Sequence, residues 1–183
     1  MPKVLVPLAQ GCEELEAVTI IDLLRRATID VVSAGLNSEP VRASRRVLLV
    51  PDTTLEEAVG MDEFDMIVLP GGLPGADNLA DCPLLIETLR RFAAEGKKIA
   101  AICAAPRVLA TIGLLDGKRA TAYPGAIDSG NYPGISYTGE AVEIDGLITT
   151  SRGPGTAMDF TLALIEQLTD RKTRDTVEAG LVR

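Results

Sequence analysis

Short apolar runs alternate with longer amphipathic segments along most of the chain. The apolar runs have the length of buried strands and are followed by turn or polar residues. They occupy residues 3–8, 29–34, 47–50, 66–69 and 98–102. The amphipathic segments have the 3.6-residue spacing of helices. They occupy residues 13–27, 83–95, 106–115 and 156–168, and a short charged helix closes the chain. This alternation predicts an α/β fold, with a mostly parallel sheet and helices on both of its faces.

The pattern changes after the fifth apolar run, where short β-like pieces replace the longer strands. These pieces lie at residues 119–123, 141–144 and 147–150. Asp145-Gly146 separates the last two and is typical of a tight hairpin turn. The chain has no internal repeat, low-complexity segment or linker, so we expect one domain over residues 1–183.

Three loops follow strands at the predicted carboxyl edge of the sheet, which is where α/β proteins bind ligands. They cover residues 9–16, 70–75 and 103–106. Candidate chemistry is therefore sought in these loops first.

Charge and composition narrow the classes of partner. With 26 acidic and 18 basic residues, the chain has a formal net charge of -8, which disfavours nucleic acids and anionic membranes. No apolar stretch has the length of a signal peptide or a membrane span. The three cysteines form no metal or redox pair, so we expect free thiols in a cytoplasmic protein.

The chain contains no histidine. A Cys-His or Ser-His pair within one subunit and a His-ligated zinc are therefore excluded. The glycine-rich signatures of dinucleotide and nucleoside triphosphate sites are also missing. We expect neither a metal nor a cofactor, and proton transfer near neutral pH must use a carboxyl, thiol, phenol, amine or water.

Cys103 lies where the apolar run 98–102 meets a helix that begins near Pro106. Small neighbours, including Ala104, permit a tight turn that resembles a nucleophile elbow. The start of a helix is expected to lower the pKa of such a thiol. A buried structural cysteine is the alternative interpretation of the same position.

The other two loops carry groups that suit a nucleophile. Gly71-Gly72 follows a strand and can bring backbone N–H groups close to an oxyanion, or form an ordinary turn. Glu13 and Glu14 are best explained as charges that stabilise a helix start. Glu16 falls one turn later, near the apolar face, where burial would raise the pKa of its carboxyl and let it carry a proton.

Four stretches together resemble the ThiJ/PfpI superfamily, within it the branch of the Parkinson-disease-associated protein deglycase and its bacterial relatives. They occur in the order of the family and span nearly the whole chain. They are Gly11-Cys12-Glu13-Glu14-Leu15-Glu16, Val68-Leu69-Pro70-Gly71-Gly72, Ala100-Ala101-Ile102-Cys103-Ala104-Ala105-Pro106 and Thr150-Ser151-Arg152-Gly153-Pro154-Gly155-Thr156.

The resemblance implies a flavodoxin-like sheet, a homodimer and a reactive, easily oxidised Cys103. Glu16 would be the protonated carboxyl that is hydrogen-bonded to this thiol, and the amides of Gly72 and Ala104 would form an oxyanion pocket.

The resemblance also implies roles for basic residues. Arg25, Arg26 and Arg45 would lie near the dimer interface and the pocket, with Arg45 lining the site from the partner subunit. Tyr123 stands where some members have a histidine. This departure argues against a peptidase and shifts proton transfer to Glu16.

The resemblance leads us to expect a cofactor-free cysteine enzyme that acts on 2-oxoaldehydes such as methylglyoxal, or on their early adducts with amines and thiols. It would be glyoxalase-like or a protein deglycase. The alternative is a redox-sensing stress protein or chaperone in which Cys103 is oxidised to sulfinic acid. A role in thiazole biosynthesis, an older label in the family, has no support among the motifs.

Overall fold

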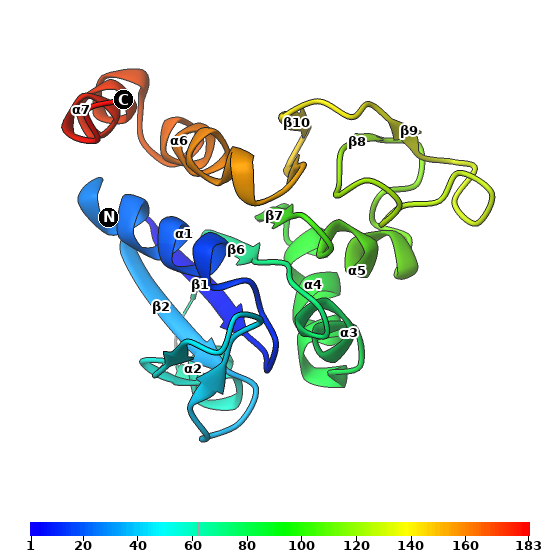
Figure 1. The fold of residues 1–183 in the computed structure, drawn as a ribbon, viewed down its shortest axis with the longest axis horizontal. Helices are drawn as coiled ribbons and strands as arrows, with labels where there is room; N and C mark the ends of the chain where they lie inside the picture. Colours follow the sequence, from blue (N-terminus) through cyan, green and yellow to red (C-terminus); the bar gives the residue numbers. More distant parts are fainter. Residues whose placement is uncertain (62) are drawn as a thin grey trace.

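A seven-stranded sheet forms the centre of the structure, a computed structural model that describes residues 1–61 and 63–183 (Figure 1). The strand order is β10-β11-β7-β6-β1-β2-β5, and every neighbouring pair is parallel except β10 with β11. In that order the strands are Val142–Asp145, Ile148–Ser151, Lys98–Ile102, Met66–Leu69, Lys3–Leu8, Asp30–Gly35 and Thr53–Thr54. This confirms the predicted flavodoxin-like α/β class.

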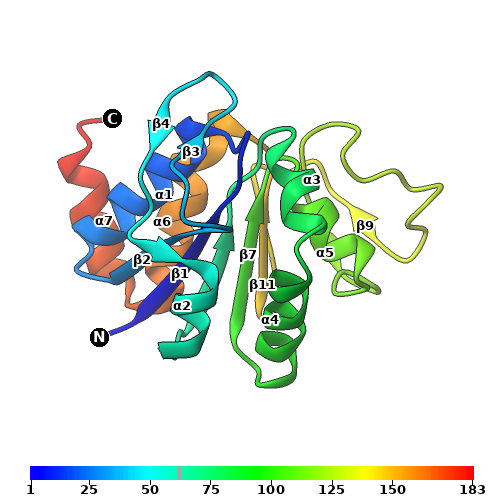
Figure 2. The ribbon, with the colours of Figure 1, turned by 90° about the horizontal axis from the view of Figure 1, so that it is seen from below.

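Helices cover both faces of the sheet (Figure 2). On one face lie α1 (Glu14–Arg26) and α6 (Ala157–Leu168), with α7 (Arg171–Gly180) packed against α6. The other face carries four helices. They are α2 (Leu55–Met61), α3 (Gly75–Ala80), α4 (Pro83–Ala94) and α5 (Pro106–Thr111). A 3-10 turn, η1 (Pro154–Thr156), leads into α6.

The two-residue period of the strands divides the core into two layers. In β1, Val4 and Val6 join the cluster under α1 and α6, whereas Leu5 joins the cluster under α2 to α5. Because both faces are buried, the strands are apolar throughout rather than alternating. Because β1, β6 and β7 run parallel, their carboxyl ends lie at the same edge of the sheet, and the candidate site is located there.

The prediction that residues 47–50 form a strand like the other apolar runs is wrong. Only Leu48–Leu49 is extended, as β4, and it pairs antiparallel with β3 (Val41–Arg42) in a separate small sheet. Val50 is 80% exposed and Leu48 56%, and of this run Leu49 is the residue that packs against the core.

Other boundaries follow local turn chemistry. Asp145-Gly146 makes the predicted hairpin, with Asp145 of β10 paired with Ile148 of β11. The helix expected over 106–115 ends at Thr111, and α2 and α3 were not predicted. Of the piece expected at 119–123, only β8 (Arg119–Ala120) is a strand, and it pairs with β9 (Ser136–Tyr137).

Among the described residues, no helix has the length and apolar character needed to cross a membrane.

Candidate active site

Cys103 follows β7 directly and has a left-handed backbone with a φ of 66°. This conformation is unfavourable for residues with a side chain and is held by the surrounding structure. The Cys103 N–H donates to the Ser151 carbonyl at 3.0 Å, and its own carbonyl accepts from the Tyr123 N–H at 2.8 Å. The sharp turn predicted between β7 and α5 is thus present and anchored on both sides.

The Gly71-Gly72 loop approaches Cys103 so closely that side chains are excluded. A Cβ atom on Gly71 would lie 2.7 Å from Cys103 Cβ and 2.9 Å from the Ala104 nitrogen. Gly72 has a φ of 89°, and a Cβ atom there would collide with the Glu13 backbone. The backbone N–H groups of Gly72 and Ala104 both hydrogen-bond to the Cys103 sulfur. Two converging amides of this kind are suited to an anionic sulfur or oxygen.

Glu16, in the first turn of α1, is completely buried beside this turn. Its Oε2 accepts a hydrogen bond of 2.8 Å from the Gly71 N–H. Its Oε1 has no conventional hydrogen-bond partner in the described part of the chain, although the carboxyl is close enough to the Cys103 thiol to interact with it. Burial raises the pKa of Glu16 to about 7, as predicted for a proton-carrying carboxyl.

The expectation that the helix start lowers the pKa of Cys103 is wrong for the thiol next to an ionised Glu16. Burial and the Glu16 charge raise the pKa of Cys103 to about 12, and the Gly72 and Ala104 amides offset only part of this rise. Near neutral pH the pair therefore retains at least one proton. A thiolate can form at this pH only when that proton lies on Glu16.

Tyr123 lies next to Cys103, because its backbone N–H donates a hydrogen bond to the Cys103 carbonyl. Its side chain is 52% exposed, and its ring packs against Gly153, where a Cβ atom would be 3.3 Å from Tyr123 Cδ2. Tyr123, which stands where some family members have a histidine, therefore lies next to the Cys103 turn and lines a cavity at the surface.

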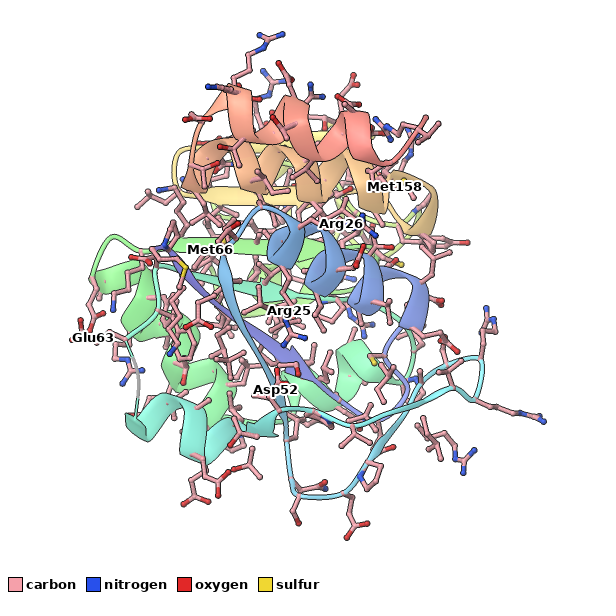
Figure 3. The ribbon with its side chains drawn as sticks, turned by 90° about the vertical axis from the view of Figure 1, so that its left-hand side faces the viewer. Arg25, Arg26, Asp52, Glu63, Met66 and Met158 are labelled. Carbon is pink, nitrogen blue, oxygen red and sulfur yellow. The ribbon has the colours of Figure 1, made fainter. Side chains whose placement is uncertain are left out.

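The basic residues that the family resemblance places near the dimer interface and the pocket make other contacts within one copy of the chain. Arg25 donates to the Val31 carbonyl and to Asp52, toward which it points (Figure 3). Arg26 pairs with Asp22 at 2.7 Å at the end of α1, ten residues and about 15 Å along the helix from Glu16.

Arg45 lies on the turn between β3 and β4, and its guanidinium group donates to the Ser44 carbonyl at 3.5 Å. Its backbone N–H is bound by the Glu14 carboxylate at 2.9 Å. The structure therefore brings Cys103, Glu16 and the glycine loop together, but not Arg26 or the Arg45 side chain.

Glu14 has a contact that the helix-start interpretation missed. Its carboxylate, like that of Glu13, accepts from the Ser44 hydroxyl, which ties the β3–β4 turn to the start of α1. An ion pair between Asp77 and Arg107 likewise joins α3, which follows the glycine loop, to α5, which follows the Cys103 turn. Both pairs join residues about 30 positions apart, so no local pattern signals them.

The other thiols differ from Cys103 in their surroundings. Cys12 is completely buried, and burial, followed by the charge of Glu14, raises its pKa to about 12. Cys82 is partly buried at the start of α4. In residues 1–61 and 63–183, no group of three or more Cys, Asp or Glu side chains is arranged to hold a metal ion.

Comparison with known proteins gives one consistent relationship. Residues 2–167 match the DJ-1/PfpI family. The Parkinson disease protein 7 homolog of Danio rerio is 42% identical over 186 residues, covering 98% of this chain and 96% of that protein. The glutathione-independent glyoxalase DJR-1.2 of Caenorhabditis elegans is 37% identical over 159 residues, covering 87% and 84% of the two chains.

A solved structure supports the same relationship. The crystal structure of Drosophila melanogaster DJ-1beta superimposes with a TM-score of 0.93 at 43% identity, covering 99% of this chain and 97% of that one. The matches in sequence and in structure both extend over nearly the full length, and they include the loops that carry Cys103 and Glu16. The chain therefore belongs to the DJ-1/PfpI family.

Proposed function

We propose that the protein is a cofactor-free enzyme that converts 2-oxoaldehydes such as methylglyoxal to 2-hydroxy acids, with Cys103 as nucleophile. One observation carries the proposal. A buried carboxyl whose pKa is about 7, that of Glu16, lies beside a cysteine whose sulfur is bound by two backbone amides. The chain thus offers a nucleophile, a proton carrier and an anion pocket at one point.

The first step needs only a shift of one proton within the pair. Glu16 takes the proton of the thiol, and the Cys103 sulfur attacks the aldehyde carbon to form the carbon–sulfur bond of a hemithioacetal. The oxygen of the former aldehyde becomes negative and is held by the Gly72 and Ala104 amides until Glu16 returns the proton to it. Histidine is not required for this sequence.

The second step is an internal redox rearrangement. The Glu16 carboxylate removes the hydrogen from the former aldehyde carbon as a proton, and the neighbouring ketone carbon receives a proton in return. The first carbon is thereby oxidised to a thioester and the second is reduced to an alcohol. Water then cleaves the thioester, releasing the 2-hydroxy acid and regenerating the Cys103 thiol. No external oxidant or reductant is consumed.

The C. elegans relative, named as a glutathione-independent glyoxalase, supports this class of reaction. Independence of glutathione agrees with a site that has its own cysteine. We further propose that early adducts of 2-oxoaldehydes with amines or thiols are processed at the same site, as a protein deglycase would do. The cavity beside Tyr123 offers room for a bulkier group on one side of the turn.

Methylglyoxal consumption by wild type and Cys103→Ala, with D- and L-lactate quantified separately, tests the proposal. We expect many turnovers to one lactate enantiomer in the wild type and none in the variant. Consumption limited to one equivalent, or equal rates in both proteins, would contradict an enzyme. The same assay with a preformed methylglyoxal adduct of N-acetylcysteine, in the presence of a scavenger of free methylglyoxal, separates deglycase from glyoxalase activity.

The buried Glu16 carboxyl beside the Cys103 thiol also favours a second candidate, a redox-sensing stress protein. A sulfinic acid at Cys103 would present acidic oxygens that a protonated Glu16 could bind. Titration with hydrogen peroxide followed by mass spectrometry should then show selective addition of two oxygen atoms to Cys103. Equal oxidation of Cys82 would contradict selectivity.

We propose that the protein acts as a homodimer in the cytoplasm. Exposed apolar side chains support the dimer: Leu15 and Val18 of α1 are 50% and 49% exposed, and Leu48 of the adjacent β4 is 56% exposed. Arg26 and Arg45 would belong to this interface, with Arg45 of one copy reaching the site of the other. The three free thiols are in keeping with a reducing compartment.

A further inference from the structure

The stretch from Arg152 to Thr156 forms one wall of a cavity that the proposed chemistry does not use. The cavity has a volume of about 300 Å³. Its walls come from two segments, Tyr123-Pro124 and Arg152 to Thr156. This volume lies at the lower end of the range for small-molecule sites and suits a ligand of a few carbon atoms.

The cavity adjoins Cys103 through the backbone. Ser151, whose carbonyl accepts from the Cys103 N–H, immediately precedes Arg152, and Tyr123 donates its N–H to the Cys103 carbonyl. Paired strands are about 4.8 Å apart and successive residues about 3.3 Å apart, so the Arg152 backbone lies within roughly 10 Å of Cys103. Cys103 does not itself line the cavity, but a five-carbon substrate held at its sulfur is long enough to span most of this distance.

Arg152 gives the cavity its charge. The residues that line it in the described structure include this one cation and no carboxylate. The Arg152 guanidinium donates to the Gly139 carbonyl at 3.0 Å through Nη1 and has no ion-pair partner among the described residues. A guanidinium group without an ion-pair partner can bind a planar carboxylate through charge-assisted hydrogen bonds.

The backbone around Arg152 is held firmly. The Ser151 and Thr156 hydroxyls are hydrogen-bonded at 2.7 Å, both are buried, and Thr156 also binds the Gly153 N–H. The Arg152 N–H donates to the Ala141 carbonyl. The segment is therefore a rigid support for the guanidinium rather than a loose surface turn.

We infer that this Tyr123–Arg152 cavity is a subsite for 2-oxoaldehydes that carry a carboxylate at the far end, which it distinguishes from neutral ones such as methylglyoxal. The inference rests on the proposed function. A suitable substrate is 4,5-dioxopentanoate, whose aldehyde would meet Cys103 while its carboxylate meets Arg152. The reaction oxidises its aldehyde carbon, reduces the adjacent ketone and adds one water, which gives 2-hydroxyglutarate without any other reactant.

The test compares kcat/KM for 4,5-dioxopentanoate and for its methyl ester, which is uncharged and similar in shape. A charge-assisted hydrogen bond corresponds to about 10- to 100-fold in kcat/KM, so we expect the wild type to prefer the acid by at least tenfold. In Arg152→Gln this ratio should fall to within about twofold of one, and Arg152→Lys should give an intermediate value. Arg91→Gln, an exposed arginine of α4 at the other end of the sheet, is the matched control and should keep the wild-type ratio. An Arg152→Gln variant with the wild-type preference would overturn the inference.

A binding measurement separates this inference from the proposed function. Titration calorimetry with 2-hydroxyglutarate on Cys103→Ala requires no turnover. We expect Cys103→Ala/Arg152→Gln to bind it at least tenfold more weakly than Cys103→Ala. Equal affinities, or no binding to either variant, would overturn the subsite even if methylglyoxal is turned over. A clear loss of affinity would support it even if no 2-oxoaldehyde is consumed.

Discussion

Glu16 accepts a hydrogen bond of 2.8 Å from the backbone N–H of Gly71, so the buried acid is fixed to the loop whose next amide binds the Cys103 sulfur. The acid comes from α1 and the loop follows β6. One bond thereby sets the position of a proton carrier and of an anion pocket relative to each other.

Glu16→Gln should lower kcat/KM for methylglyoxal by at least about 100-fold, the usual effect of losing a general acid–base group. Glutamine keeps the bond from Gly71 but cannot take the thiol proton. Glu87→Gln, a change at an exposed residue of α4, is the control and should leave the rate unchanged. Full turnover by Glu16→Gln would rule out Glu16 as the proton carrier.

The raised pKa of Glu16 also predicts a pH-dependent stability. Its pKa rises from 4.5 to about 7 on folding, so the folded state binds more protons within this window. The resulting stabilisation is complete below about pH 4.5 and is lost as the pH rises through 7, by about 3 kcal/mol in total. Urea unfolding at pH 4 and pH 8 should show a smaller loss of stability in Glu16→Gln than in the wild type. Parallel losses in the two proteins would show that Glu16 titrates normally.

Gly71→Ala should disrupt the site by steric contact alone. The new methyl group would lie 2.7 Å from Cys103 Cβ and 2.8 Å from the Ile102 carbonyl oxygen, so the loop and the turn must separate. We expect a loss of about 1–3 kcal/mol in the free energy of unfolding, as for overpacking, and a strong fall in kcat/KM. Gly60→Ala in α2 is the matched control, since a Cβ atom there meets nothing within 4 Å. Equal behaviour of the two variants would contradict the close approach.

Leu48→Asp should shift the proposed homodimer toward monomer. A charge in place of this exposed apolar side chain would be buried without a partner in an interface formed by α1 and β4. Light scattering after size-exclusion chromatography gives the mass directly. Ile144→Asp, at an exposed apolar residue of β10, should leave the mass unchanged. A wild-type protein that runs as a monomer, or a dimer that tolerates Leu48→Asp, would exclude this interface.

Local signals in the sequence were sufficient for the main elements and for the central residues of the site. Cys103 and Gly71 each follow a buried strand, and the sheet rule alone brings such positions together. The burial of Glu16 follows from its place one turn into α1, near the apolar face.

Tertiary contacts decided what could not be predicted. The direction of the Cys103 pKa depends on burial and on Glu16, which lies 87 residues away, and these outweigh the effect of the helix start. Residues 47–50 have the composition of a strand, but the turn before them is held at the start of α1 by Glu14 and Ser44. The lack of an ion-pair partner for Arg152 among the described residues likewise depends on which carboxylates lie near it in the folded chain.

The two ends of the central sheet bear on how copies of the protein can associate. An outer strand with free backbone groups is a template on which another chain can add a strand. At one end β5 has only two residues, and at the other β10 lies against β8. The sheet thus offers little backbone for edge-to-edge growth, which protects the protein from fibre-like polymerisation. We therefore expect association between copies to use side-chain contacts rather than strand pairing.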